Sequence, residues 1–228
     1  MESSTRLNKY LALATGSSRR EADNMIAEGR VKVNGTLAVL GGRIDPKNDT
    51  ILLDGETLRE APAMSYFAFN KPRGYVCSRR AQGDSPTIYA LLPDDMHNLK
   101  PVGRLDRDSS GLLLLTNDGD FAYQMTHPKF HKSKIYEVEL DKDLQPLHRQ
   151  MISDFGVMLD DGKSKFEVER LNDENKKWRI TMSEGRNRQI RRTFSAIGYE
   201  VAELHRTTFG QYSLGDIRSG EYKTTDIR

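Results

Sequence analysis

Residues 103–120, GRLDRDSSGLLLLTNDGD, enclose an apolar run between turn-forming residues. The run Gly111–Thr116 predicts a buried strand, because a short apolar segment bounded by turn signals is typical of a strand covered on both faces. Asp106 precedes it on a turn, between Arg104 and Arg107. The guanidinium groups favour the carboxylate form of Asp106, and such a turn holds it rigidly, as a nucleophile requires. From these residues alone, a structural ion-paired aspartate explains the pattern better than a catalytic one.

Outward from this strand, the C-terminal part of the chain mixes strands and helices without regular alternation. Tyr66–Asn70 and Lys134–Leu140 have strand character, and Gln189–Gly198 has helical spacing. Further predicted elements are a helix start at 121–125, a helix at 144–155 and strands at 157–159, 166–168 and 178–182. We therefore expect an α+β fold with a mixed, mainly antiparallel sheet and flanking helices.

The N-terminal part predicts a small two-helix unit. Apolar residues recur at helical spacing in residues 7–14, and Ser18 with Glu21 forms a capping-box pattern at the start of a second helix. Asn34-Gly35 is a strong hairpin signal, whereas residues 59–65 contain a proline and lack periodicity. The predicted organisation is a domain at 1–60, a linker at 61–65 and a larger domain at 66–228.

The composition limits the class of protein. The 228 residues are 36% apolar, enough for a core, and 35 basic against 33 acidic residues give a net charge of +2. No apolar run approaches the roughly 20 residues of a membrane span, and no secretory signal is visible at the N-terminus. The single cysteine, Cys77, excludes an internal disulfide and is interpreted as an inert thiol. A cytoplasmic protein without membrane association is expected.

Basic residues gather in three segments that contain no acid, at 71–80, 129–134 and 185–193, whereas acids collect elsewhere, as in Asp160-Asp161. Arginine suits bidentate phosphate contacts and stacking on bases. The three segments therefore predict a basic surface and a polyanionic partner.

Two other patterns are interpreted as structural. Residues 156–164, GVMLDDGKS, resemble a phosphate-binding loop, but the spacing is one residue too long and strand-like residues follow. Asp161-Gly162 is therefore predicted to be a hairpin turn. His127 and His131 have a spacing found in metal sites, but no third ligand is evident, so no metal is expected.

The segment RLNKYLA…SSRREADNMIAEGRVKVNG resembles the small S-four RNA-binding domain first known from a ribosomal small-subunit protein, over about residues 5–55. In that family, two helices and the adjoining turn present basic residues to structured RNA. The resemblance implies that RNA contacts come from the basic residues on the polar sides of these elements: Arg6, Lys9, Arg19, Arg20 and Lys32.

Ordered motifs in the larger domain carry a second resemblance. They are NKP at 70–72 with Gly74, GRLDRDSSGLLLLTNDGD at 103–120, KIYEVEL at 134–140, EGRNRQIRR at 184–192 and VAELHRTTFG at 201–210. This order is similar to that of the pseudouridine synthases that modify bacterial ribosomal RNA. The resemblance implies a catalytic Asp106, a Tyr136 that lies against the target base and an Arg191 beside the catalytic carboxylate. Ile190 is expected to line the pocket, and Arg104 is a further predicted substrate-binding residue.

The implied reaction converts a uridine to pseudouridine in ribosomal RNA of either subunit, with no cofactor. Asp106 could attack the anomeric carbon of the ribose or remove the 2′ proton, and the sequence does not choose between these routes. Ribosomal RNA or an assembly intermediate is the expected partner, and a monomer is expected. Two other hypotheses are a non-catalytic RNA-binding assembly protein and a glycoside hydrolase that uses Asp106 with Asp108.

Overall fold

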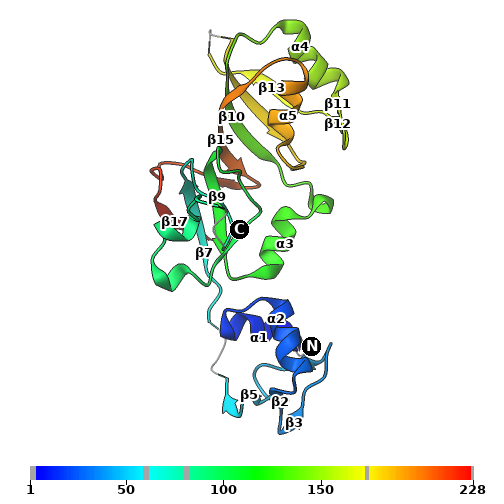
Figure 1. Cartoon of the computed structure of the whole chain (residues 1–228), viewed down its shortest axis with the longest axis vertical. Coiled ribbons are helices and arrows are strands. Elements are labelled where there is room, and N and C mark those ends of the chain that lie inside the picture. The colour runs from blue at the N-terminus through cyan, green and yellow to red at the C-terminus, as the bar shows by residue number, and fades with distance from the viewer. Residues whose placement is uncertain (1–3, 59–61, 80–82, 173–174, 227–228) are drawn as a thin grey trace. The chain divides into compact units, whose positions relative to one another are not determined.

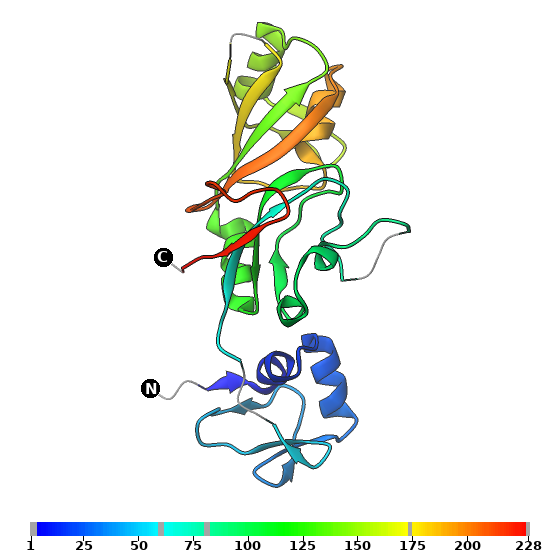
Figure 2. The same cartoon turned by 90° about the vertical axis from the view of Figure 1, so that its left-hand side faces the viewer.

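The computed structural model describes residues 4–58, 62–79, 83–172 and 175–226. The chain divides into two compact units, residues 1–64 and 65–228 (Figures 1 and 2). Residues 59–61 of the predicted linker segment and Arg80 of the first basic segment lie outside the described residues. In the part of the chain that is described, no helix has the length and apolar character needed to cross a membrane.

Two short helices dominate the first unit: α1 (Leu7–Thr15) and α2 (Arg19–Ala27). Helix α1 ends at Gly16, whose left-handed φ of 72° suits a residue without a β-carbon. The predicted capping box at Ser18 is present, because its side chain accepts from the Glu21 backbone and the Glu21 side chain accepts from the Ser18 backbone. The two helices therefore begin and end where local chemistry satisfies their free backbone groups.

A small sheet completes the first unit, with strand order β3-β2-β5-β6. Its strands are β2 (Val31–Val33), β3 (Thr36–Leu37), β5 (Ile51–Leu53) and β6 (Glu56–Thr57), and a separate pair joins β1 (Thr5–Arg6) to β4 (Arg43–Ile44). Asn34 has a φ of 50° in the β2–β3 turn, as the predicted Asn-Gly hairpin requires. Apolar residues of both helices and the sheet share one core, which includes Leu11, Ala22 and Val31.

The second unit is built on one mixed sheet, with a main strand order of β13-β14-β10-β15-β9-β7-β17. Short strands β8 and β16 pair with β9 and β15. Of the strand pairs in the described residues, β15–β9 is parallel and the others are antiparallel. The strands are β7 (Tyr66–Lys71), β8 (Lys100–Val102), β9 (Ser110–Thr116), β10 (Lys134–Leu140), β13 (Glu167–Arg170), β14 (Lys177–Met182), β15 (Val201–Phe209), β16 (Tyr212–Ser213) and β17 (Tyr222–Thr224). The mixed, mainly antiparallel α+β fold is confirmed.

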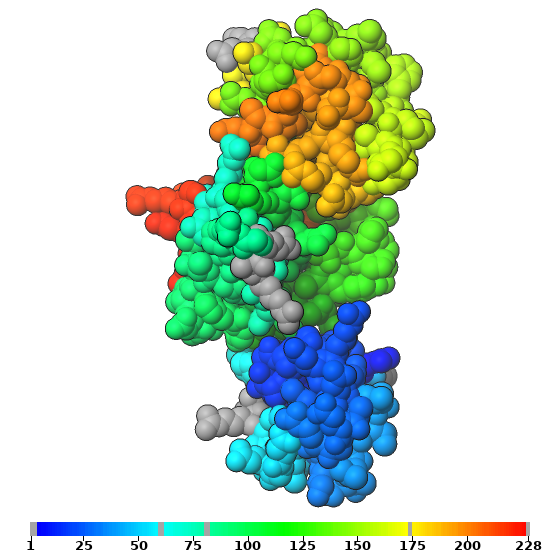
Figure 3. All heavy atoms as spheres, viewed as in Figure 1, coloured from blue at the N-terminus to red at the C-terminus, as the bar shows by residue number. Residues whose placement is uncertain are grey.

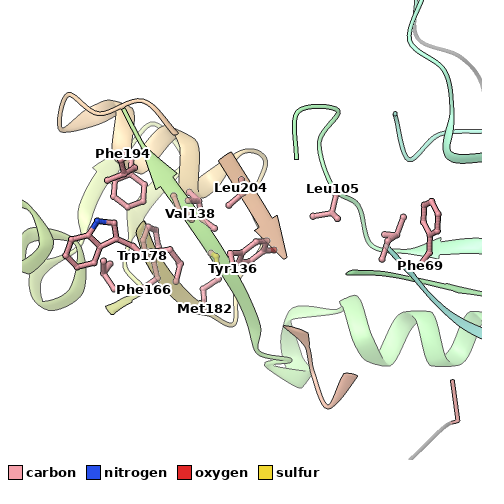
Figure 4. Close-up of a cluster of buried hydrophobic side chains, with 14 of the residues drawn as sticks. Phe69, Leu105, Tyr136, Val138, Phe166, Trp178, Met182, Phe194 and Leu204 are labelled. Atoms are coloured by element: carbon pink, nitrogen blue, oxygen red, sulfur yellow. The ribbon is translucent and has the colours of Figure 1, made fainter. Parts of the chain in front are cut away.

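The central strand β9 is covered on both faces, as its apolar run predicts. Leu113 and Leu115 belong to the larger core, whereas Leu112 and Leu114 belong to a second core on the other face. The larger core continues along β10 and β14 to Trp178 (Figure 4). Because successive strand residues point to opposite faces, one apolar run fixes β9 between two layers.

Helices and a hairpin flank the sheet. The helices are α3 (Gly119–Thr126), α4 (Pro146–Gln150) and α5 (Gln189–Ala196), and shorter turns are η1 (Ile88–Leu91), η2 (Asp94–Met96), η3 (Pro128–Phe130) and the π-helical η4 (Met151–Phe155). The hairpin consists of β11 (Val157–Leu159) and β12 (Gly162–Ser164). Gly156, the first residue of the phosphate-loop-like segment, precedes this hairpin, so the segment is not a strand–loop–helix unit.

The predicted secondary structure needs three corrections, for a missed strand, a helix and a turn. Strand β15, at the centre of the sheet, is absent from the predicted elements. The helix predicted at 144–155 is a short α4 that widens into a π-helical turn. The hairpin turn is formed by Asp160 and Asp161, one residue earlier than predicted, because Gly162 already pairs with Leu159.

Candidate active site

A turn between β8 and β9 carries Asp106, and buried hydrogen bonds hold this turn. Ser109 donates its backbone N–H to the carbonyl of Asp106 over 3.1 Å. Lys71, at the end of β7, is fully buried, and its Nζ donates to the carbonyls of Asp106 (3.1 Å) and Ser109 (2.7 Å). Burial lowers the pKa of Lys71 below its usual value. The Asp106 backbone is therefore clamped by a side chain from the neighbouring strand.

Glycine allows the strand after this turn to approach β15 closely. Gly111 has a φ of 102°, and a β-carbon there would lie 2.3 Å from the carbonyl oxygen of Arg206. Gly111 pairs with Arg206 in the parallel β9–β15 contact. Any side chain at Gly111 would push β15 away from the turn of Asp106, so this glycine sets the geometry of the site.

The side chain of Asp106 lies near Arg188, which is distant in the sequence. Its Oδ2 lies 3.6 Å from Nη1 of Arg188, and about a third of the side chain (32%) is exposed. The same Arg188 donates to both carboxylate oxygens of Asp108, over 3.0 and 3.1 Å. Arg188 has a left-handed φ of 47° at the start of α5. One guanidinium thus bridges two aspartates, in a backbone conformation that is uncommon for arginine.

Arg191, predicted to lie beside the catalytic carboxylate, makes its ion pair with Asp108. Its Nε lies 3.3 Å from Asp108 Oδ2, and its two Nη groups donate to the carbonyls of Val201 (2.6 Å) and Asp108 (3.0 Å). Burial alone raises the pKa of Asp108, but the hydrogen bond from Arg188 and the charge of Arg191 outweigh it and leave this pKa below the usual value. In the structure, the direct ionic partner of Asp106 is Arg188.

The arginines next to Asp106 in the sequence do not form its ion pair. Arg104 and Arg107 are exposed, and in the described part of the chain neither is ion-paired to Asp106. The rationale that flanking guanidinium groups hold the carboxylate is therefore corrected, because consecutive residues of this turn point in different directions. Arg104 does line the cavity described next.

A cavity of about 920 Å³ opens beside Asp106. The predicted site residues Asp106, Tyr136, Ile190 and Arg104 all line it, whereas Arg191 is not among its lining residues. Tyr136 on β10 is almost buried (8% exposed). Figure 4 shows Tyr136 and Leu204 from neighbouring strands, with Leu105 on a separate loop. The part of the wall formed by Leu105, Tyr136 and Leu204 is therefore apolar and aromatic, with the Asp106 carboxylate nearby, and such a wall suits a flat ring.

Several Lys and Arg side chains also line this cavity, and two of them, Lys134 and Arg206, are largely buried. Lys134 donates to the carbonyl of Glu184 over 3.0 Å, and burial, with the nearby charge of Arg206, lowers the pKa of Lys134 to about 8. Arg206 is almost completely buried, donates from Nε to the Leu112 carbonyl over 2.8 Å and lies 4.9 Å from the centre of the Phe209 ring. The positive charges suit an anionic ligand that carries a ring.

The hydrolase hypothesis fits this geometry poorly. A glycosidase needs two carboxyl groups, one on each side of the scissile bond. Here Asp106 and Asp108 contact the same Arg188 guanidinium, and Asp108 does not line the cavity.

Among the described residues, no group of three or more His, Cys, Asp or Glu could hold a metal ion. Cys77 exchanges hydrogen bonds with the backbone of Leu105, and burial raises the pKa of its thiol.

The predicted RNA-binding residues of the first unit lie mainly on its surface. Arg6, Arg19, Arg20 and Lys32 are exposed, and Lys9 is half-buried. Arg19 donates to Asn8 over 3.1 Å, which links α2 to α1. Arg6 and Lys9 lie at the start of α1, and Lys32 lies on β2. The structure thus brings Arg19 next to α1, and the role of each residue in RNA binding stays a prediction.

The fold and site define a class of protein: an α+β catalytic domain with the Asp106 carboxylate beside a pocket that Tyr136 lines, joined to a small two-helix unit. The chain matches the RNA pseudouridylate synthase family over residues 65–196 and the S4 domain over residues 5–45. It therefore belongs to the RNA pseudouridylate synthase family and carries an S4 domain.

Individual relatives span nearly the whole chain. A ribosomal small subunit pseudouridine synthase A of Pasteurella multocida is 38% identical over 224 residues, which cover 96% of this chain and 95% of the relative. A ribosomal large subunit pseudouridine synthase B of Bacillus subtilis is 36% identical over 222 residues, with coverages of 95% and 90%. The crystal structure of a pseudouridylate synthase is similar with a TM-score of 0.69, 33% identity and coverages of 97% and 96%.

Lys71 and Arg188 were not predicted to be site residues from the sequence. Lys71 belongs to the NKP motif, and its place at the end of an apolar strand is a signal that a lysine is buried. Arg188 belongs to the basic segment at 185–193, but nothing in the sequence shows which of its arginines reaches Asp106. A distance between segments about 80 residues apart is a property of the fold.

Proposed function

We propose that this protein isomerises a uridine to pseudouridine in ribosomal RNA, that Asp106 is the catalytic residue and that no cofactor takes part. The observation that carries the proposal is the position of the Asp106 carboxylate, next to Arg188 and at the wall of a cavity that Tyr136 and Ile190 also line. The names of the relatives support ribosomal RNA as the substrate. They include enzymes of both subunits, so the proposal covers either.

The reaction breaks the bond from the ribose to nitrogen 1 of uracil and joins the same ribose carbon to carbon 5. No group or electron is gained, because the proton of carbon 5 leaves and nitrogen 1 takes one up. The target base must leave its stack to enter the cavity, at a cost of a few kcal/mol. Tyr136 offers an aromatic face to the flipped base, and such contacts are worth about 1–3 kcal/mol.

Asp106 has two possible roles in this scheme. It attacks the anomeric carbon, or it removes the 2′ proton and a glycal forms. In both roles its carboxylate needs a fixed direction. Lys71 fixes its backbone and Arg188 its side chain. Arg188 also balances the charge of the carboxylate, since a buried anion without a partner is costly.

The first unit supplies RNA affinity in this proposal. Its candidate contacts are Arg6, Lys9, Arg19, Arg20 and Lys32, which meet phosphates of folded RNA. The proposed organisation is an RNA-binding domain at 1–60, a linker at 61–65 and a catalytic domain at 66–228. We further propose that the protein acts as a monomer in the cytoplasm.

The test of the proposed function is Asp106→Asn, assayed on unmodified transcripts of small- and large-subunit ribosomal RNA. We expect the full-length wild-type chain to form pseudouridine at a defined position, and Asp106→Asn to bind the same transcript with unchanged affinity but form no product. Asp143→Asn, an exposed carboxylate of the same unit, is the matched control and should keep full activity.

Two results would contradict the proposal. Near-normal turnover by Asp106→Asn would remove Asp106 from the mechanism. RNA binding by the wild-type chain without pseudouridine in any transcript would favour the non-catalytic assembly protein instead. A pseudouridine that disappears from cellular ribosomal RNA on deletion of the gene would name the target uridine.

A further inference from the structure

Exposed aromatic rings gather where α3 ends and η3 begins. Tyr123 is 47% exposed and Phe130 is 37% exposed, and their rings meet edge to face with centroids 5.8 Å apart. The Nζ of Lys129 lies 5.1 Å from the Tyr123 centroid and 4.7 Å from the Phe130 centroid. The His127 ring lies 4.7 Å from that of Tyr123. We name Tyr123, His127, Lys129 and Phe130 the aromatic lip.

The aromatic lip adjoins the cavity of Asp106. His127 lines that cavity, as do Pro128, His131 and Lys132 of the same short segment. In the space-filling view, the green atoms of this part of the chain reach the molecular surface (Figure 3). The aromatic lip is therefore next to the cavity that receives the target base in the proposed function.

The charge around the aromatic lip suits a phosphate backbone. Residues 121–136 contain Lys129, Lys132 and Lys134 but no Asp or Glu. Within the described ranges, neither Lys129 nor Lys132 is ion-paired to a carboxylate. The acids that border this segment are Asp120 before it and Glu137 after it. The lip thus combines π faces with cations that no internal acid neutralises.

We propose that the aromatic lip binds the base of an unpaired nucleotide that flanks the target uridine. This inference rests on the proposed function, because flipping one base out of a strand also breaks the stacking of its neighbour. An exposed aromatic ring replaces that lost stack for any base, since every base has a π face. Lys129, held over both rings, meets the adjoining phosphate.

A nucleotide fits the lip better than a protein partner does. A specific protein interface buries at least about 1,000 Å² in total, and two half-exposed rings offer only a small part of that area. A single base covers about one ring, and its phosphate matches Lys129. The proposed ligand is therefore a purine or pyrimidine nucleotide of the RNA substrate.

The kinetic test replaces both exposed rings by aliphatic side chains in the double variant Tyr123→Leu/Phe130→Leu. With the ribosomal RNA transcript that the wild-type chain modifies, we expect a five- to tenfold higher KM and a kcat within twofold of wild type. Tyr222→Leu, with the same 37% exposure as Phe130, and Phe155→Leu are matched controls elsewhere on the second unit and should keep the wild-type KM. An unchanged KM in the double variant would overturn the inference.

Folding and catalysis are separated from the lip by two further measurements. The thermal midpoint of each variant reports folding, and Lys129→Gln, which leaves both rings in place, should raise KM if the double variant does not fold. Ultraviolet cross-linking of Asp106→Asn to the same transcripts, read by mass spectrometry, should place RNA adducts on Tyr123 or Phe130. Adducts confined to other residues would contradict the inference.

Failure of the proposed function gives a different pattern. In that case the wild-type chain forms no pseudouridine in any transcript, and KM cannot be measured. Cross-linking and transcript affinity then judge the lip directly: adducts on its rings support base binding, and a double variant with wild-type affinity and no adducts overturns it.

Discussion

Two basic segments of the second unit look alike in the sequence but differ in the folded protein. All four arginines of residues 185–193 are ion-paired: Arg186 with Asp161 and Glu184, Arg188 with Asp106 and Asp108, Arg191 with Asp108, and Arg192 with Asp160 and Asp161. By contrast, Lys129 and Lys132 have no carboxylate partner among the described residues. The arginines of residues 185–193 therefore form ion pairs within their own unit. Lys129 and Lys132 lack such partners among the described residues, so their charges are available to a ligand such as RNA.

The difference shows that the absence of acids nearby in the sequence does not make a surface basic. The pair Asp160-Asp161, which lies far from the arginines in the sequence, forms the turn of the β11–β12 hairpin and neutralises Arg186 and Arg192. Carboxylates of the same unit pair with the arginines of residues 185–193, and the role of this segment in binding a polyanion stays a prediction.

The largest effect should come from Arg188→Gln, which removes the charge next to Asp106 while Lys129 and Lys132 stay in place. The ion pair spans 3.6 Å and Asp106 is only about a third exposed, so an interaction of roughly 1.5–3 kcal/mol after solvent screening is expected, and kcat should fall about 10- to 150-fold. The affinity for the ribosomal RNA transcript should change little. Single-turnover rates and filter binding on the same preparation measure both.

Arg192→Gln is the matched control, since Arg192 lies on the same helix and is also paired with carboxylates, but does not contact Asp106. Its kcat should stay near the wild-type value. Arg188→Lys, which keeps a charge but loses the bidentate geometry, should recover part of the rate. A rate loss of equal size in Arg188→Gln and Arg192→Gln would show that the arginine segment acts through folding alone.

Next in size is the effect of Lys129→Gln/Lys132→Gln on binding. Each lost phosphate contact should reduce the slope of log affinity against log salt by about 0.7–0.9. The free energy of unfolding should fall by no more than about 1 kcal/mol, since Lys129 loses only exposed cation–π contacts and neither lysine has a carboxylate partner among the described residues. Lys142→Gln is the control, because Lys142 also lies over an aromatic ring, that of Tyr199, at 5.1 Å. An unchanged salt slope in the double variant would mean that RNA does not reach this segment.

A smaller effect, of opposite sign, should follow when the arginines are released. Asp160→Asn/Asp161→Asn removes both carboxylate partners of Arg192 and one of the two partners of Arg186, so the affinity for RNA should rise several-fold and the salt slope should become steeper. Asp94→Asn/Asp95→Asn removes the same charge at an exposed turn of the same unit and corrects for net charge. If both double variants gain equally, the freed arginines do not contact RNA.

Much of the fold could be predicted from local patterns, because local chemistry determines those parts. The capping box of Ser18, the Asn34-Gly35 hairpin and the two-sided burial of β9 each depend on residues within one element. Strand β15 could not be predicted in this way. Its alternation is broken by Arg206, a buried position filled by a charged residue whose Nε donates to the Leu112 carbonyl on β9.

The predictions for the site show the same difference between local patterns and long-range contacts. Asp106, Tyr136, Ile190 and Arg104, taken from motifs, all line one cavity. The partner of the carboxylate could not be assigned, because Arg188 and Arg191 are three residues apart on one turn of helix and only the approach of α5 to the 104–109 turn decides which guanidinium reaches Asp106. Tertiary packing determines the contacts between distant segments. A motif therefore identifies candidate residues, but only the folded structure shows which of them contact each other.

Lys134 differs from both the ion-paired arginines and the exposed lysines, because it is partly buried. The smallest predicted effect is the pH dependence of stability that its protonation causes. Its ammonium donates to the carbonyls of Glu184 and Ser183 and has no carboxylate partner within the described part of the chain, and burial lowers its pKa to about 8. An unfolded chain keeps this proton up to a pH of about 10.4. Between these values the unfolded state binds more protons, so the free energy of unfolding should rise with pH.

The substitution Lys134→Met isolates this contribution. Below pH 8 the folded wild-type chain carries the full cost of a buried ammonium, and the variant lacks it. As pH rises from 8 to about 10.4, the unfolding free energy of wild type should therefore gain on that of the variant, by on the order of 1–2 kcal/mol after allowance for partial exposure. Urea unfolding of both proteins across this range measures the difference, with Lys165→Met, a surface lysine that donates to the Asp154 carbonyl, as control. A difference that stays constant with pH would show that the ammonium of Lys134 is solvated in the folded chain as it is in the unfolded chain.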